Sequence, residues 1–168
     1  NIEKEKNACY GYVTIKYREG TMKKLNWGIL GTGWIAHEMG EALTAVNGEI
    51  YAVCNVRLAG AQQYAEEFGV QKVYGSPDEM FADENVDIVY IATPHNLHYE
   101  AMLKALKAGK HVFCEKSITV NSRQLEECAA LAEEKGLIIC DGTTLLHMPL
   151  YKKLRQIIEE GAIGDVKM

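Results

Sequence analysis

The sequence predicts a doubly wound α/β fold, in which helices cover both faces of a parallel sheet. Three observations support this prediction. Short apolar runs alternate along the chain with helical segments, and a glycine-rich turn directly follows the first of those runs. The 168 residues are 48% hydrophobic and 24% charged, as in ordinary globular proteins. A chain of this length buries one full core but has no room for a second large domain.

Six strands are expected, because six short runs of apolar and β-branched residues end at polar or glycine-containing turns. These runs are residues 25–30, 49–53, 73–74, 86–92, 111–114 and 137–140. Strands without a polar face are typical of a parallel sheet that helices cover on both sides. Their alternation with helices indicates the doubly wound arrangement.

Six helices are expected from apolar spacing and from end signals. They cover residues 34–46 and 58–68, a segment from Pro77, a segment ending at Gly109, a segment from Asn121 to Gly136 and a segment from Pro149 to Gly161. Ser76 as a cap, Pro77 at the first helical position and Glu79 three residues after the cap mark one start. Asn121 with Gln124 marks another.

The chain divides into three segments. Residues 1–21 show no helical period, and they are either a translated leader ahead of a start at Met22 or a native arm. Residues 22–145 hold the α/β domain. Residues 146–168 are expected to be a linking helix followed by the first strand of a C-terminal domain, so an exposed apolar surface is expected over residues 149–163.

Charge and cysteine content exclude several classes of protein. The chain has 18 basic and 23 acidic residues, a net charge of −5, which argues against a nucleic-acid partner. No apolar run approaches the roughly 20 residues that a membrane span needs. The five cysteines include no Cys-x-x-Cys pair, and Cys54, Cys114 and Cys140 lie in apolar runs. A reducing, cytoplasmic location follows from this usage.

A glycine-rich turn carries the strongest functional signal. Residues 31–36 read Gly-Thr-Gly-Trp-Ile-Ala between the first strand and the first helix. Gly31 permits a tight turn, Gly33 lets the backbone approach a pyrophosphate, and Ala36 lets the helix pack on the strand. The helix amides and dipole then face the anion. In this strand–turn–helix context the motif predicts a dinucleotide site.

The end of the second strand bears on which dinucleotide binds. An acidic residue there would hold the adenosine ribose hydroxyls and favour NAD. The sequence instead reads Cys-Asn-Val-Arg over residues 54–57. Asn55 can still bond a ribose hydroxyl, and Arg57 could pair with a 2′-phosphate. NADP is therefore favoured over NAD, although a solvated Arg57 at a helix start is an equal alternative.

The fourth strand leads into Thr93 and Pro94, where ligands of such sheets lie. His95 and His98 follow three residues apart, but no further ligand stands at metal spacing, so no metal site is expected. Asn96 and His98 are instead expected to cap and orient the next helix.

The fifth strand ends in Glu115 and Lys116. A lysine is seldom placed beside a core without a partner. Lys116 could donate a proton or hydrogen bond to a substrate oxygen at this position. The alternative is an ordinary loop lysine in water.

Three segments together resemble a known family. GILGTGWIA (28–36), VYIATPHNLHYEAMLKALKAGKHVFCEK (89–116) and HMPLYKKLRQIIEEGAIGDVKM (147–168) are similar to the N-terminal half of the glucose–fructose oxidoreductase and inositol dehydrogenase family. The resemblance implies a Rossmann domain for NAD or NADP and a C-terminal α/β domain that contributes substrate contacts and an oligomer surface. It also implies hydride transfer on a sugar, polyol or related alcohol or carbonyl compound.

The resemblance implies roles for individual residues. Lys116 is the expected catalytic residue, close to nicotinamide and substrate. The cofactor-binding residues that the resemblance implies are Gly31, Thr32, Gly33, Trp34, Ile35, Thr93, Pro94, His98, Glu115 and Lys116. Asn55 and Arg57 are added to them by the argument on the end of the second strand. Metal ligands are not implied. The partners implied are a small-molecule substrate and further copies of the intact protein, with no nucleic acid and no membrane.

Two departures from the family pattern leave an alternative open. Ser117 stands where the Glu-Lys-Pro motif has proline, and the family's second-domain catalytic residue has no counterpart in the sequence. A non-catalytic dinucleotide-binding module, a redox sensor or scaffold, is therefore the alternative. A methyltransferase-like fold is disfavoured by the six strands, the Gly-rich turn and the Glu-Lys pair.

Overall fold

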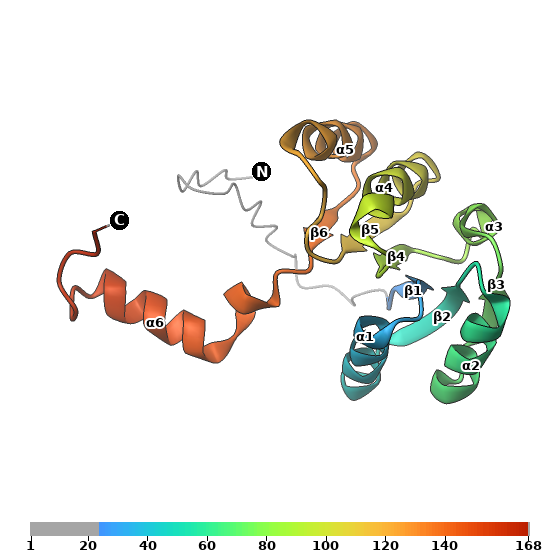
Figure 1. Ribbon diagram of the computed structural model, residues 1–168, viewed down its shortest axis with the longest axis horizontal. Helices are drawn as coiled ribbons and strands as arrows, with labels where there is room; N and C mark the ends of the chain where they lie inside the picture. The colour runs from blue at the N-terminus through green and yellow to red at the C-terminus, as the bar shows by residue number, and fades with distance from the viewer. Residues whose placement is uncertain (1–23, 168) are drawn as a thin grey trace.

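One six-stranded sheet, in the order β3-β2-β1-β4-β5-β6, forms the centre of the computed structural model, which describes residues 24–167 (Figure 1). The strands are β1 (Asn26–Leu30), β2 (Glu49–Cys54), β3 (Lys72–Tyr74), β4 (Ile88–Ile91), β5 (His111–Cys114) and β6 (Ile139–Asp141). Every neighbouring pair is parallel. The doubly wound α/β fold is therefore confirmed.

The strand order places the switch point of the sheet at β1. Leu30, the last residue of β1, lies opposite Cys54 of β2 on one side and Ile91 of β4 on the other. The loop after β1 and the loop after β4 depart toward opposite faces of the sheet. This opens a crevice at the carboxyl ends of the two strands. The residues that follow these three strand ends therefore leave the sheet side by side.

Helices cover both faces of the sheet (Figure 1). One face carries α1 (Trp34–Ala45) and α2 (Leu58–Phe68), and the other carries α3 (Pro77–Ala82), α4 (His98–Lys107) and α5 (Ser122–Lys135). Each face has its own buried core. Because strand side chains alternate, Tyr90 of β4 packs in the core under α1 and α2, and its neighbour Ile91 packs in the core under α3, α4 and α5.

Several predicted elements agree with the structure, and one predicted cap does not. The bounds of α2 and β5 match the prediction residue for residue, and the side chain of Asn121 accepts the Gln124 amide at 3.0 Å as the expected cap. Ser76 occupies the cap position of α3, but its side chain makes no capping hydrogen bond, so that detail was wrong. Asp78 and Glu79 lie in the first turn, where their negative charges interact favourably with the positive end of the helix dipole.

The strand expected after Gly161 is not formed, and residues 162–167 are turn or irregular structure. A strand needs a neighbour to satisfy its backbone groups, and none of the described strands lies there. Residues 1–21, predicted to be a leader or arm, lie outside the described residues.

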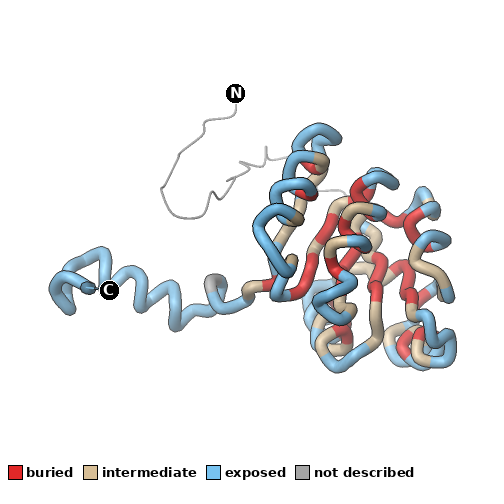
Figure 2. The backbone as a smooth tube through the Cα atoms, turned by 45° about the horizontal axis from the view of Figure 1, so that its top comes forward, coloured by how far each residue is buried: buried red, intermediate tan, exposed pale blue. Residues whose placement is uncertain are grey.

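The last helix, α6 (Pro149–Glu159), extends away from the sheet after the short 3₁₀ turn η2 (Thr144–His147) (Figure 1). It is exposed along almost its whole length (Figure 2). Leu150, Leu154 and Ile158 stand one turn apart on one side of it, and their exposed fractions are 72%, 44% and 39%. The exposed apolar surface predicted for residues 149–163 is confirmed.

The cysteines of the described region are all free thiols. Cys54, Cys114 and Cys128 are buried, whereas Cys140 is half-buried although it too lies in an apolar run. Burial raises the pKa of the Cys54 thiol to about 12, and nearby Glu79 adds to the increase. This thiol therefore remains protonated and unreactive near neutral pH.

Between residues 24 and 167, no helix combines the length and the apolar character that crossing a membrane would require.

Candidate functional site

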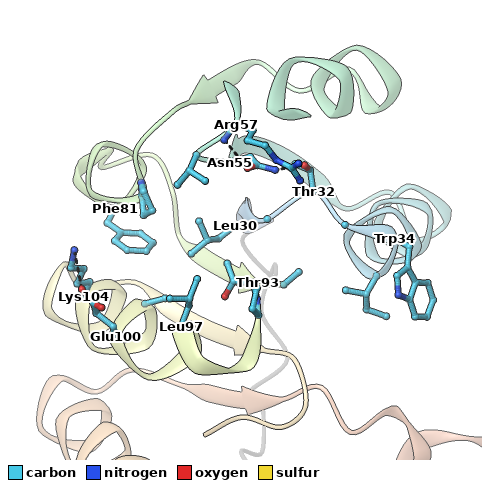
Figure 3. Close-up of a pocket in the computed structure, with 18 residues that line it drawn as sticks. Leu30, Thr32, Trp34, Asn55, Arg57, Phe81, Thr93, Leu97, Glu100 and Lys104 are labelled. Carbon is cyan, nitrogen blue, oxygen red and sulfur yellow. Dashed lines mark hydrogen bonds and ion pairs between the residues drawn. The ribbon is translucent and has the colours of Figure 1, made fainter. Parts of the chain in front are cut away.

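A pocket of about 660 Å³ opens beyond the carboxyl ends of β1, β2 and β4, at the switch point (Figure 3). The glycine-rich turn and Asn55 form one wall, Thr93 and Leu97 form the opposite wall, and Phe81 lies at one end (Figure 3). Nine predicted site residues line it, namely Gly31, Thr32, Gly33, Trp34, Ile35, Asn55, Arg57, Thr93 and Pro94. The sheet topology thus brings together residues that are far apart in sequence.

Gly31 and Gly33 shape the pocket in different ways. Gly31 has φ +97°, and a Cβ placed on it would lie 2.6 Å from the backbone oxygen of Ala92, so a side chain is excluded by both conformation and space. A Cβ on Gly33 would meet no atom within 4 Å. Open space therefore lies directly in front of the α1 N-terminus, whose first amides have no helical carbonyl to bond.

Asn55 links the glycine turn to the start of α2. Its Nδ2 donates to the Thr32 hydroxyl, and its Oδ1 accepts the backbone N–H of Arg57 at 2.9 Å. Gly60 of α2 packs directly against this contact, since a Cβ on it would lie only 3.1 Å from the Thr32 hydroxyl oxygen. Asn55 therefore holds the glycine-rich turn in place. This structural role is additional to the ribose contact that the sequence predicts for it.

Arg57 lines the pocket with an exposed side chain. Among the ion pairs of residues 24–167, none involves its guanidinium group. The three residues before it, at the end of β2, are Cys, Asn and Val, so none of them supplies a carboxylate. This rim of the pocket is therefore suited to an anionic group.

Thr93 carries a buried hydroxyl that finds no hydrogen-bond partner in the described structure. The residue lines the pocket directly after β4. An unpaired buried hydroxyl costs about 1–3 kcal/mol, so such groups are normally satisfied by protein, water or ligand. Thr93 therefore carries a hydroxyl whose hydrogen-bonding capacity is unused in the described structure.

His98 lies beneath the pocket wall and does not line it. The residue is fully buried, with Nε2 2.8 Å from the backbone oxygen of Thr93 and Nδ1 2.9 Å from that of Ser117. Helix α4 has no side-chain cap, so the expectation that Asn96 and His98 cap it was wrong. A short 3₁₀ turn, η1 (His95–Leu97), begins the helix instead.

Glu115 and Lys116 lie outside the pocket lining, directly after β5. Glu115 is buried, whereas Lys116 is exposed to solvent, as in the alternative of an ordinary loop lysine. The peptide bond between Lys116 and Ser117 is cis. A Cβ on Gly142, after β6, would lie 3.0 Å from Glu115 Oε1, so this glycine lets the two segments pack closely.

A carboxylate–phenol hydrogen bond holds Glu115. The Tyr90 hydroxyl donates to Glu115 Oε1 at 2.7 Å, and the backbone N–H of Lys116 donates to Oε2 at 3.2 Å. Burial, together with this carboxylate, raises the pKa of Tyr90 well above its usual range. The phenol therefore remains protonated near neutral pH and can donate this hydrogen bond.

Sequence reasoning missed the far wall of the pocket. Residues of α3 and of the η1–α4 segment form it, namely Pro77, Phe81, Leu97, Glu100, Ala101 and Lys104. Lys104 forms ion pairs with Asp78 at 3.0 Å and with Glu100 at 3.7 Å. Positions 97, 100, 101 and 104 have helical spacing, so they share one face of the helix. That spacing was the available signal, but it does not reveal which helix faces the switch point.

No group of three or more His, Cys, Asp and Glu side chains in the described region is arranged to hold a metal ion.

The sequence matches the family described as "Oxidoreductase family, NAD-binding Rossmann fold" over residues 25–143. It is 38% identical over 163 residues to D-xylose 1-dehydrogenase (NADP⁺) from Hypocrea jecorina, covering 88% of this chain and 41% of that protein. It is 35% identical over 147 residues to trans-1,2-dihydrobenzene-1,2-diol dehydrogenase from Mus musculus, covering 86% and 44%. The chain thus spans less than half the length of these relatives.

Two crystal structures of similar proteins contain dinucleotides. A 3-ketoreductase from Actinomadura kijaniata, in complex with TDP-benzene and NADP, superposes with a TM-score of 0.80 at 34% identity, over 85% of this chain and 46% of that one. Scyllo-inositol dehydrogenase from Lactobacillus casei, with NAD(H) and scyllo-inositol, superposes with a TM-score of 0.78 at 27% identity, over 85% and 43%.

Proposed function

Since this chain belongs to the glucose–fructose oxidoreductase and inositol dehydrogenase family and carries its NAD-binding Rossmann domain, we propose that residues 22–145 bind NADP at the switch point and serve a sugar or polyol oxidoreductase. The observations that support this most directly are the open space at Gly33, in front of the α1 N-terminus, and the unpartnered hydroxyl of Thr93 on the opposite wall of the same pocket. Both features fit a ligand with a polar diphosphate and a polar ring.

The pocket residues would hold the dinucleotide in a defined direction. The amides at Thr32, Gly33 and Trp34 would bind the pyrophosphate at the positive end of α1. Asn55 and Arg57 would hold the adenosine ribose. Thr93 and Pro94 would border the half that carries the nicotinamide, on the β4 side of the switch point.

The dinucleotide supplies hydride chemistry when bound, and the protein supplies orientation and charge. In our proposal Lys116 donates a hydrogen bond or proton to the substrate oxygen, which favours the alcohol product as hydride arrives at carbon. Its exposed ammonium group can reach an approaching substrate without loss of a protein partner, since no ion pair among residues 24–167 involves it.

NADP is favoured over NAD by Arg57. Its guanidinium group matches a 2′-phosphate in charge and geometry, whereas the rim lacks the carboxylate that would hold a 2′-hydroxyl. The relative from Hypocrea jecorina is named as an NADP⁺ enzyme. The scyllo-inositol dehydrogenase structure contains NAD(H), so family membership alone does not decide the choice.

The substrate of the intact protein is proposed to be a sugar, polyol or related small alcohol or carbonyl compound. D-xylose and scyllo-inositol are named for similar proteins. We propose that residues 146–168 link this domain to a substrate domain, which would cover the apolar side of α6 and contribute to a homo-oligomer. A cytoplasmic location agrees with the free thiols of the described region, and neither nucleic acid nor membrane is proposed as a partner.

Titration of NADPH and NADH into the chain, followed by nicotinamide fluorescence, tests the proposal. We expect NADPH to bind more tightly, and Arg57→Ala to weaken NADPH binding roughly tenfold while leaving NADH affinity unchanged. Lys72→Ala is the control, because Lys72 is an exposed cation on β3 that does not line the pocket. Absence of NADPH binding would refute the function, and an unchanged preference in Arg57→Ala would refute the role of Arg57.

A further inference from the structure

The segment that carries Lys116 is held on both sides by buried polar side chains. Lys116 itself is exposed, but each of its chain neighbours contacts a buried side chain of another element. Glu115 accepts a hydrogen bond from the hydroxyl of Tyr90, in the middle of the sheet. The backbone oxygen of Ser117 lies 2.9 Å from Nδ1 of His98, in the first turn of α4.

Tyr90 acts from the face of the sheet that α1 and α2 cover. It is 1% exposed and packs against Phe113 with 5.5 Å between ring centroids. Its hydroxyl donates to Glu115 Oε1, and the other carboxylate oxygen accepts the backbone N–H of Lys116. Glu115 is 8% exposed, and no basic side chain among residues 24–167 pairs with it. The phenol is therefore its main side-chain partner.

His98 acts from the face that α4 covers. Its two ring nitrogens lie within 2.9 Å of two backbone oxygens, one on Thr93 and one on Ser117. Carbonyl oxygens only accept, so a ring protonated on both nitrogens donates to both, and a neutral ring donates to one. A ring protonated on both nitrogens therefore ties the loop after β4 to the loop after β5, whereas a neutral ring bonds one of the two loops and lies against the other.

The two loops are neighbours by register as well. Ile91 pairs with Cys114, and the backbone N–H of Glu115 donates to the Ile91 oxygen at 3.0 Å. Glu115 and Lys116 therefore leave the sheet beside Ala92 and Thr93, which line the pocket. His98 joins these loops at the point where the pocket wall meets the lysine segment.

We propose that Tyr90 and His98 are positioning residues that fix the backbone on either side of Lys116, so that its side chain is presented to the nicotinamide end of the pocket. The inference rests on the proposed function, because it takes NADP as the ligand and Lys116 as the catalytic residue. Neither Tyr90 nor His98 touches the ligand. Each acts through a hydrogen bond to a neighbour of Lys116.

The test measures where the Lys116 amine lies when ligand is bound. The chain is acetylated with a water-soluble acetylating reagent in the presence of NADPH or of 2′-phospho-ADP-ribose, which lacks only the nicotinamide. Mass spectrometry of peptides gives the rate at Lys116, and Lys72 serves as the internal reference. In the wild type we expect NADPH to slow acetylation of Lys116 roughly tenfold relative to 2′-phospho-ADP-ribose.

Tyr90→Phe and His98→Asn are expected to reduce this protection to about twofold or less, because each removes one buried hydrogen bond beside Lys116. Both should still bind 2′-phospho-ADP-ribose with wild-type affinity, which shows that they are folded. The matched controls should retain full protection. Tyr74→Phe removes a phenol–carboxylate bond of the same 2.7 Å length to Asp83, and His111→Asn removes a backbone hydrogen bond at the other end of β5.

The outcomes separate this inference from the proposed function. Full protection of Lys116 in both variants would overturn the positioning roles and leave NADP binding intact. Binding of NADPH without any protection in the wild type would overturn the placement of Lys116. Failure of the wild type to bind either ligand would overturn the proposed function and this inference with it. If one of the two variants does not fold, the protection of Lys116 in the other variant tests the positioning role.

Discussion

The side-chain amide of Asn55 donates to the hydroxyl of Thr32, so the end of β2 is joined to the glycine-rich turn after β1. The same side chain accepts the Arg57 amide. The two loops that would hold the pyrophosphate and the adenosine ribose are therefore one connected unit. A change in one loop is expected to alter ligand binding at the other.

Asn55→Asp should convert the dinucleotide preference toward NADH. An aspartate can still accept from the Thr32 hydroxyl and the Arg57 amide, so the turn is preserved. Its charge would repel a 2′-phosphate and hold ribose hydroxyls, which should shift the NADPH-to-NADH affinity ratio by roughly tenfold or more. Fluorescence titration measures this ratio. Asn55→Ala is the control, since it breaks the link and should weaken both ligands. An unchanged ratio in Asn55→Asp would contradict the assignment of this rim.

Gly33→Ala should weaken dinucleotide binding without unfolding the domain. Its Cβ would enter space that is empty in the protein, so the melting temperature should stay the same, while dinucleotide affinity should fall by roughly tenfold or more. Gly31→Ala makes the contrast. Its Cβ would collide with the Ala92 backbone at a φ of +97°, which should lower stability by about 2 kcal/mol or more. Thermal melts and titrations of both variants check this pair, and tight binding by Gly33→Ala would refute the role proposed for the open space at Gly33.

Thr93→Val should separate stability from binding. Valine keeps the shape of threonine but removes a buried hydroxyl that has no partner among residues 24–167. The free energy of unfolding should therefore stay constant or rise by up to about 1 kcal/mol. Affinity for NADPH should decrease, because the ligand would lose a hydrogen bond. Chemical denaturation and titration measure the two effects, and a less stable variant would show that the hydroxyl has a partner after all.

Acid should weaken the fold through Asp83. Burial alone would raise the pKa of this carboxyl, but hydrogen bonds from the Asn85 backbone and the Tyr74 hydroxyl outweigh it and lower the pKa from 3.8 to about 2. A carboxyl with a lowered pKa in the folded state stabilises fully above its unfolded pKa. That contribution is lost as the pH falls from about 4 to about 2. Urea unfolding across this range should show a smaller pH dependence for Asp83→Asn than for the wild type. Equal slopes would contradict the assignment.

Much of the fold could be predicted because its signals are local. The bounds of α2 follow from apolar spacing and from Gly69, which closes the helix in the left-handed conformation. The turn over residues 31–36 identified the pocket, since its chemistry is carried by contiguous residues. Apolar runs such as His111–Cys114 identified the strands, because parallel strands need no polar face.

What remained unpredicted depends on contacts between distant segments. The wall formed by Phe81 and Lys104 depends on how α3 and α4 pack, which periodicity does not specify. His98 was expected to act within its own helix, but its partners belong to two separate loops. Tyr90 was not singled out, because a tyrosine in an apolar strand gives no sign of the carboxylate 25 residues later that it bonds.

The isolated position of α6 affects how the chain should melt. A helix of 11 residues is marginal in water on its own, because too few backbone hydrogen bonds offset the entropy of forming its first turn. Its principal contacts are with η2, not with the sheet. Heating should therefore remove the helical signal of α6 before the cooperative transition of the sheet domain, so circular dichroism should show a sloping baseline and then a sharp step. If a binding partner covers the apolar side of α6, the helix and the sheet domain should melt together in a single transition.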